Sequence, residues 1–247
     1  MLRSLKCEVQ KSGRFSKLGV VWAIFFIVSI LVTVIEYYSM LDFNQNNIFM
    51  EYFIANLDFI LVKIMLPAML ILVSATTFAT EFSSGTMKTF LVCGIKRSKI
   101  FLGKIVFLFF TMLLYVFFIV ISLTIIFLFL KGGEFVLSVN YLKVISLYFL
   151  AGFGTFPVML LVVLFSLFIM NFEKCLIASF ASFFIFLSAD SIIEKPFCTP
   201  TGFLNGCSLL FNNSIGDYYY GVAFWMLYCI ALIVISFCIF NRKDIWS

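Results

Sequence analysis

Six long stretches almost free of charge are the feature that most constrains how this chain can fold. A helix needs about 20 mostly apolar residues to cross about 30 Å of hydrocarbon. With 64% hydrophobic and 12% charged residues in 247, the composition lies well outside that of soluble domains. The sequence therefore predicts an all-α membrane protein, a single transmembrane domain whose six helices span residues 18–38, 54–80, 104–130, 143–171, 174–192 and 218–240.

The fifth predicted span is the shortest. Its charge-free part covers residues 175–189, which is about 22 Å of helix at about 1.5 Å per residue. The helix must either continue past Asp190 or end inside the membrane, and the pattern leaves both options open.

Basic residues are distributed unevenly among the segments between the spans. Most of the 17 Lys and Arg residues lie before the first span, between the second and third spans, or near the C-terminus. Because basic loops stay on the cytoplasmic side, both termini are predicted to be cytoplasmic in a multi-pass protein of the plasma membrane.

Several chemistries are excluded by residues that the chain lacks. It has no histidine, which excludes a Ser-His-Asp hydrolase, a His-ligated zinc protease and an imidazole proton relay. A GxxxxGK[ST] phosphate loop is also absent from the sequence. Seven cysteines occur without a CxxC pair, although Cys198 and Cys207 lie in one predicted outer segment and could form a disulfide. We expect neither an enzyme nor a metal site.

The first 17 residues combine an apolar face with basic residues elsewhere. Leu2, Leu5 and Val9 cluster on one side of a helical wheel, which favours a helix lying on the cytoplasmic leaflet. The alternative is a disordered basic segment that only sets the topology.

The loop over residues 81–99 carries its own pattern. Ser83, Ser84 and Gly85 interrupt the second span, and a short amphipathic helix is predicted from about Thr86 to Cys93. On geometry alone this helix is either a passive element of the membrane surface or a rigid lever held by a soluble partner.

Lys63 is the one basic residue that the pattern places deep in a predicted span. A charge at membrane depth is costly unless it is paired or hydrated. Either Asp58 or Glu36 is a candidate partner. The three residues therefore form either a structural ion pair or part of a substrate path.

A resemblance to a known family appears in and around the loop over residues 81–99. The chain is similar to the permeases of ABC-2-type transporters in the motif Phe78-Ala79-x-Glu81-x-x-x-Gly85-Thr86-x-Lys88, followed by Arg97-Ser98-Lys99-Ile100 and Gly103-Lys104. The resemblance implies an interfacial elbow helix over residues 1–17, a coupling loop over 81–99, and a re-entrant outer segment over 193–217. The residues it implies for coupling to an ATPase are Glu81, Gly85, Thr86, Met87, Lys88, Phe90, Leu91 and Arg97.

In size the chain is similar to bacterial permeases that export bacitracin, lantibiotics or other amphiphilic peptides. The resemblance implies a separate ATPase that binds ATP and Mg²⁺, a second copy of the chain or a related permease, and an amphiphilic peptide or lipid-like cargo, with membrane lipid around it and no nucleic acid. Antimicrobial peptide resistance is the expected biology. The alternative is a channel or secondary carrier without an ATPase, for which internal repeats and several intramembrane charges would be typical.

Overall fold

The computed structural model describes residues 16–40, 63–87, 97–131, 139–192, 199–202 and 215–242. Within these ranges the chain forms six helices and no strand. In chain order they are α2 (Ser16–Met40), α4 (Leu66–Ser83), α6 (Arg97–Lys131), α8 (Val139–Phe168), α9 (Phe172–Ile192) and α11 (Ile215–Arg242). The helical architecture expected from the apolar runs is thus present in the described part of the chain, apart from short turns and connections at residues 84–85, 169–171 and 199–201.

Five helical stretches are long and apolar enough to cross a membrane. They are Lys63–Ser83, Arg97–Ile125, Tyr148–Phe168, Phe172–Asp190 and Tyr220–Arg242. The apolar stretch of α2, Ala23–Ile35, is shorter. Five of the six predicted spans therefore meet this criterion. The first span, 18–38, lies within α2 but stays a prediction.

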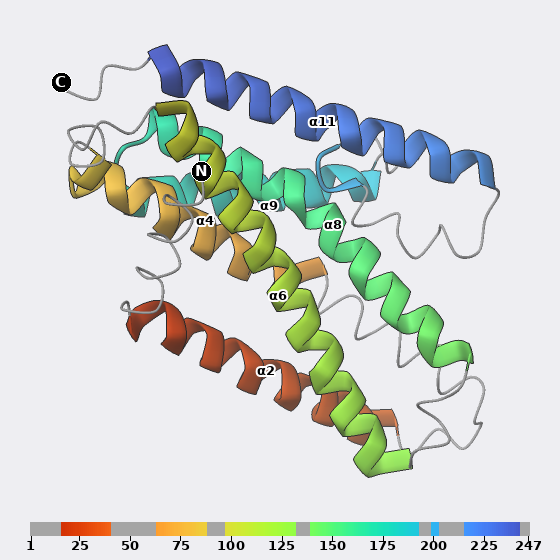
Figure 1. Cartoon of the computed structure of the whole chain (residues 1–247). Helices are drawn as coiled ribbons and strands as arrows, with labels where there is room; N and C mark the ends of the chain where they lie inside the picture. The colour runs from red at the N-terminus through yellow and green to blue at the C-terminus, as the bar shows by residue number, and fades with distance from the viewer. Residues whose placement is uncertain are drawn as a thin grey trace.

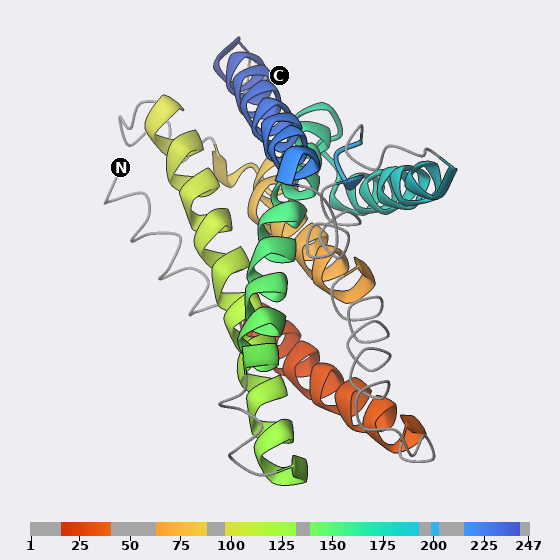
Figure 2. The same cartoon turned by 90° about the vertical axis from the view of Figure 1, so that its right-hand side faces the viewer.

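α8 occupies the middle of the helix bundle (Figures 1 and 2). It packs most extensively against α4 and α11, and it also contacts α6 and α9. α2 packs against α6 and lies on the opposite side of the bundle from α11 in both views. α8 therefore packs against both α4 and α11, which also meet directly through the rings of Phe82 and Phe240.

The outer helices show apolar surface that a soluble protein would hide. On α11, Leu227, Ile230 and Val234 are more than half exposed, whereas the stretch Tyr148–Phe168 of α8 is mostly buried, largely in the core shared with α4 and α6. A membrane helix is apolar both toward its neighbours and toward lipid, because the hydrocarbon is as apolar as the core.

The helices α6 and α8 approach each other closely at Gly152. A Cβ atom built on Gly152 would lie 2.3 Å from Cγ2 of Val116 on α6. The sequence provides a residue without a side chain at the point where the two backbones come together.

Two helices begin before the spans that they contain. α6 begins at Arg97, before the predicted span 104–130, and α8 begins at Val139, before the predicted span 143–171. A helix continues through a lysine without difficulty, so the bounds of the spans within these helices stay a prediction.

α9 resolves the two options for the fifth span, because it continues past Asp190 to Ile192. A turn follows at residues 199–202, closed by a hydrogen bond of 3.0 Å from the Gly202 N–H to the Thr199 carbonyl. Residues 1–15 of the predicted elbow lie outside the described residues, whereas residues 16 and 17 begin α2. The rest of the predicted re-entrant segment, with Cys198 and Cys207, also lies outside them.

Candidate functional site

The candidate site begins where α4 ends. The Ser84 N–H donates to the Thr80 carbonyl at 2.9 Å and the Gly85 N–H to the Phe82 carbonyl at 3.3 Å. Gly85 has φ +70°, a left-handed conformation that glycine adopts at little cost. Helical geometry resumes at Thr86. The break predicted at Ser83, Ser84 and Gly85 is therefore confirmed.

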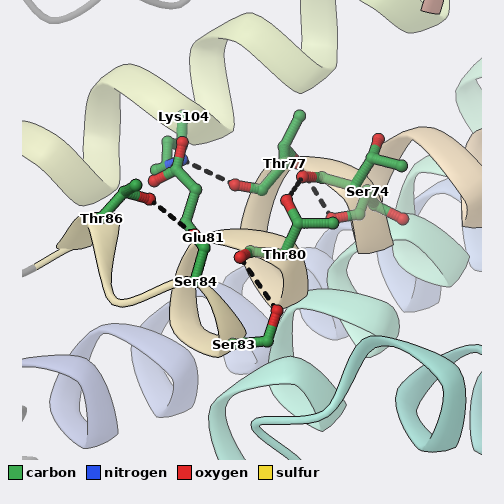
Figure 3. Close-up of polar contacts among 9 residues, drawn as sticks. Ser74, Thr77, Thr80, Glu81, Ser83, Ser84, Thr86 and Lys104 are labelled. Carbon is green, nitrogen blue, oxygen red and sulfur yellow. Dashed lines mark hydrogen bonds and ion pairs between the residues drawn. The ribbon is translucent and has the colours of Figure 1, made fainter. Parts of the chain in front are cut away.

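A buried ion pair lies directly behind this turn. The Lys104 Nζ on α6 is 2.8 Å from the Glu81 Oε2 on α4, and both side chains are almost fully enclosed. The same ammonium donates a hydrogen bond of 2.7 Å to the Thr77 carbonyl and lies 5.2 Å from the ring centre of Phe78. Figure 3 shows Lys104 reaching from α6 toward α4.

These contacts explain how a charge is accommodated inside the bundle. Lys104 lies seven residues after the start of α6, which is about 10 Å along the helix. An isolated ammonium there would be expensive to desolvate, and a carboxylate, a carbonyl and an aromatic face together offset that cost. The pair thereby holds α4 and α6 together on either side of the loop over residues 81–99.

Of the other predicted coupling residues, Thr86, Met87 and Arg97 have contacts in the structure. The Thr86 hydroxyl lies 3.0 Å from the Ser84 hydroxyl. Met87 is 1% exposed and packs in the main core, and Arg97 donates a hydrogen bond of 3.3 Å to the Asn241 carbonyl at the end of α11. Lys88, Phe90 and Leu91 lie outside the described residues. The structure thus brings Glu81, Gly85, Thr86 and Met87 together around the turn that ends α4.

The candidate substrate-path residues are not brought together by what the structure describes. Lys63 is half-buried at the beginning of the helical stretch that leads into α4. Glu36 lies on α2, but its side chain is outside the described part, as is all of Asp58. Their pairing stays a prediction.

A hollow of about 670 Å³ adjoins the end of α4. Phe82 and Ser83 line one side, and residues 169–174, which connect α8 to α9 and form the first turn of α9, line the other. Asn171 begins α9 by accepting a hydrogen bond of 3.1 Å from the Glu173 N–H, as an N-cap residue does. Two helix-connecting segments far apart in sequence thus meet at one surface.

Lys104 and Thr77 are the residues of this site that sequence reasoning missed. The charge pattern indicates only that Lys104 lies at the edge of the predicted span 104–130. The signal that could have found it is its distance from the basic cluster at residues 96–99, because a lysine more than a helical turn beyond such a cluster calls for a partner.

Five apolar helices and a buried junction beside a helix-connecting loop define a multi-pass membrane protein. Residues 4–189 match the family model described as ABC-2 family transporter protein. The chain belongs to this family and is a membrane permease component of an ABC-2-type transporter. Among individual curated proteins, none matches the chain.

Membership has consequences for partners and cofactors. Permeases of this family typically lack the ATPase, so the chain works with an ATPase subunit. In the described ranges, no three Cys, Asp or Glu side chains gather as metal ligands. The absence of a cofactor on this chain stays a prediction.

Proposed function

We propose that the chain exports an amphiphilic peptide or lipid-like cargo across the bacterial plasma membrane, driven by ATP hydrolysis in a separate subunit. Both termini and the 81–99 loop are cytoplasmic in this proposal, as the distribution of basic residues predicts. The ATPase grips the coupling loop and displaces α4 and α6 during its cycle.

The observation that carries this proposal is the Glu81–Lys104 ion pair. A lever transmits force only if it is fixed to the parts that it must move. The pair is buried and joins the helices at both ends of the loop, so a displacement of the loop reaches α4 and α6 together. Met87 adds an apolar anchor, because its side chain lies in the core.

In this arrangement Glu81 and Met87 are positioning residues, since neither side chain is accessible to a partner. The ATPase contacts the rest of the loop, including Lys88, Phe90 and Leu91. The hollow lined by Phe82, Ser83 and residues 169–174 adjoins the end of α4, where this loop begins. Glu173 and Lys174 are exposed there and provide charges of both signs for a soluble partner.

Two glycine substitutions test the lever. A Cβ atom built on either Gly85 or Gly19 would have no atom within 4 Å, but Gly85 has φ +70° whereas Gly19 lies within the helix α2. Gly85→Ala strains the turn, and Gly19→Ala is the matched control. Each tagged full-length chain is purified in mild detergent from its native membrane, and co-purifying proteins and vanadate-sensitive ATP hydrolysis are measured.

We expect a stoichiometric P-loop ATPase with the wild-type chain and with Gly19→Ala, and reduced recovery or uncoupled hydrolysis with Gly85→Ala. Equal recovery and coupling for all three would reject the lever. A wild-type chain that purifies without any ATPase would favour the channel or secondary carrier, and Lys63, Asp58 and Glu36 would then be the residues to study.

The lipophilic character of the spans supports the proposed cargo. Phenylalanine accounts for 35 of the 247 residues, and such a pathway suits an acyl chain or an amphiphilic peptide better than a sugar. Cells with and without the chain would be compared for resistance to a panel of such peptides. Unchanged resistance across the panel would argue against peptide export.

A second permease completes the pathway in this proposal, because six spans form half of such a transporter. The partner is another copy of the chain or a related permease. Two differently tagged copies expressed together would co-purify from membranes if the chain forms a homodimer, and would separate if it pairs with a different permease.

A further inference from the structure

A proline within α8 removes one of the backbone hydrogen bonds of that helix. Pro157 lies inside α8 and has no N–H to donate to the carbonyl four residues earlier, which belongs to Phe153. In a membrane, a backbone carbonyl without a donor is costly, because no water is available to replace the bond.

The missing donor is replaced from another helix. The indole N–H of Trp225 on α11 donates a hydrogen bond of 2.8 Å to the Phe153 carbonyl. The Trp225 and Phe153 rings also meet edge to face, with centroids 6.4 Å apart. The bond joins residues 72 positions apart in the sequence, so it is a tertiary contact that fastens α11 to α8.

The same short segment is held from its other side. Val116 of α6 packs directly on Gly152, and the ring of Phe109 on α6 lies 6.2 Å from that of Phe153. The region around Pro157 is thus fixed to α6 by packing and to α11 by a hydrogen bond. The packing can slide, whereas a hydrogen bond to a single carbonyl sets a register.

We infer that Trp225 is a positioning residue for transport: its indole replaces the donor that Pro157 removes and makes α8 and α11 move as one body. α8 packs most extensively against α4 and α11, so a displacement of α4 reaches α11 through α8, in addition to the direct contact between the rings of Phe82 on α4 and Phe240 on α11. This last step rests on the proposed coupling to an ATPase, whereas the replacement of the donor does not.

The donor replacement is tested by a double-mutant cycle on the full chain in mild detergent. Trp225→Phe removes the N–H and should lower the thermal unfolding midpoint by roughly 2 to 4 °C. Pro157→Ala restores a backbone donor for the Phe153 carbonyl, so Trp225→Phe should cost much less in that background. Phe224→Leu is the control, since it alters an exposed aromatic residue of the same helix.

An equal loss from Trp225→Phe in both backgrounds would overturn the donor replacement. A loss that largely disappears with Pro157→Ala supports it. If Pro157→Ala alone lowers the midpoint, the cycle still gives the coupling, because it compares the two Trp225→Phe effects.

The transmission is tested in the complex with the ATPase, at a temperature at which every variant is folded. Cys238 is an exposed cysteine of α11, and the other cysteines are replaced so that N-ethylmaleimide labels Cys238 alone. Labelling rates are measured without nucleotide and with Mg-ATP plus vanadate. We expect the rate to change roughly twofold or more in the wild type and Phe224→Leu. In Trp225→Phe the change should be clearly smaller while the ATPase is still recovered, but not absent, because Phe237 and Phe240 beside Cys238 also contact Phe101 of α6 and Phe82 of α4 directly.

A wild-type rate that ignores nucleotide, or a Trp225→Phe rate that responds as the wild type does, would overturn the transmission. If Trp225 has a purely structural role, Trp225→Phe would lower the unfolding midpoint without reducing the response of the Cys238 labelling rate to nucleotide. Failure to recover any ATPase would instead reject the proposed function, and the unfolding cycle would still decide the donor replacement.

Discussion

Two buried carboxylates in this protein are stabilised in different ways. Glu81 on α4 is paired with the ammonium of Lys104 on α6 at 2.8 Å. Asp190, near the end of α9, accepts hydrogen bonds from the hydroxyls of Thr199 and Thr201, the latter at 2.5 Å. The first carboxylate is neutralised by an opposite charge from another span, and the second is solvated by neutral donors from the following turn.

The difference sets how each region responds to change. An ion pair concentrates its cost, because removal of one partner leaves a charge in a place that was built for two. Hydroxyl donors share the cost, because each can be lost separately. The α4–α6 junction should therefore behave as one rigid unit, and the turn after α9 as a contact that weakens in steps.

The largest expected effect comes from Lys104→Met. The substitution keeps the apolar stem and leaves Glu81 as an uncompensated buried charge, so the free energy of unfolding should fall by about 3 to 5 kcal/mol. Equilibrium unfolding of the full chain in mixed detergent and SDS measures this change. A loss below that of any Asp190 variant would remove the distinction between the two regions.

Replacement of both charges should recover part of that loss. In Glu81→Leu/Lys104→Met no buried charge remains, and the double variant should be more stable than Lys104→Met by about 2 kcal/mol or more. The same unfolding experiment compares the two. If the two substitutions simply add, the ion pair is not what holds the junction.

Asp190→Asn should have a smaller effect. The amide keeps the shape and one acceptor oxygen but loses the charge that strengthens both hydroxyl bonds, and we expect a loss of about 1 to 2 kcal/mol. The measurement is the unfolding free energy, with Ser188→Ala on the exposed side of α9 as control. A cost comparable to that of Lys104→Met would show that Asp190 has a stronger partner.

The smallest expected effect is that of Thr201→Val. Its shape is conserved and one of the two hydroxyl donors is removed, which should cost about 0.5 to 1.5 kcal/mol. Thr199 still holds the carboxylate. The unfolding curves of Thr201→Val and Asp190→Asn, measured together, should rank in that order, and the reverse ranking would mean that Thr201 does more than bind Asp190.

The helices were predictable because each depends on a local property, the length of an apolar run. α2, α9 and α11 begin and end within a few residues of the predicted bounds. The turn at Gly85 was also predictable, since it depends on three consecutive residues with known preferences. The residue types around this turn likewise pointed to the family to which the chain belongs.

The contacts of Lys104 and Trp225 were not predictable from such patterns. Each depends on which helix faces which, and a run of apolar residues has no preferred partner. Lys104 finds a carboxylate on α4, and Trp225 finds a carbonyl that Pro157 has left without its usual donor. The proline had indicated only a place where α8 could bend or pack closely.

The hydrogen bond from Arg97 to the Asn241 carbonyl has a consequence for synthesis of the protein. It joins the first residue of α6 to the end of α11, 144 positions later. The ribosome must therefore complete nearly the whole chain before this contact can form. Until then the beginning of α6, which follows the loop over residues 81–99, lacks one of its partners, so a half-made permease does not yet present this side of the junction in its final form.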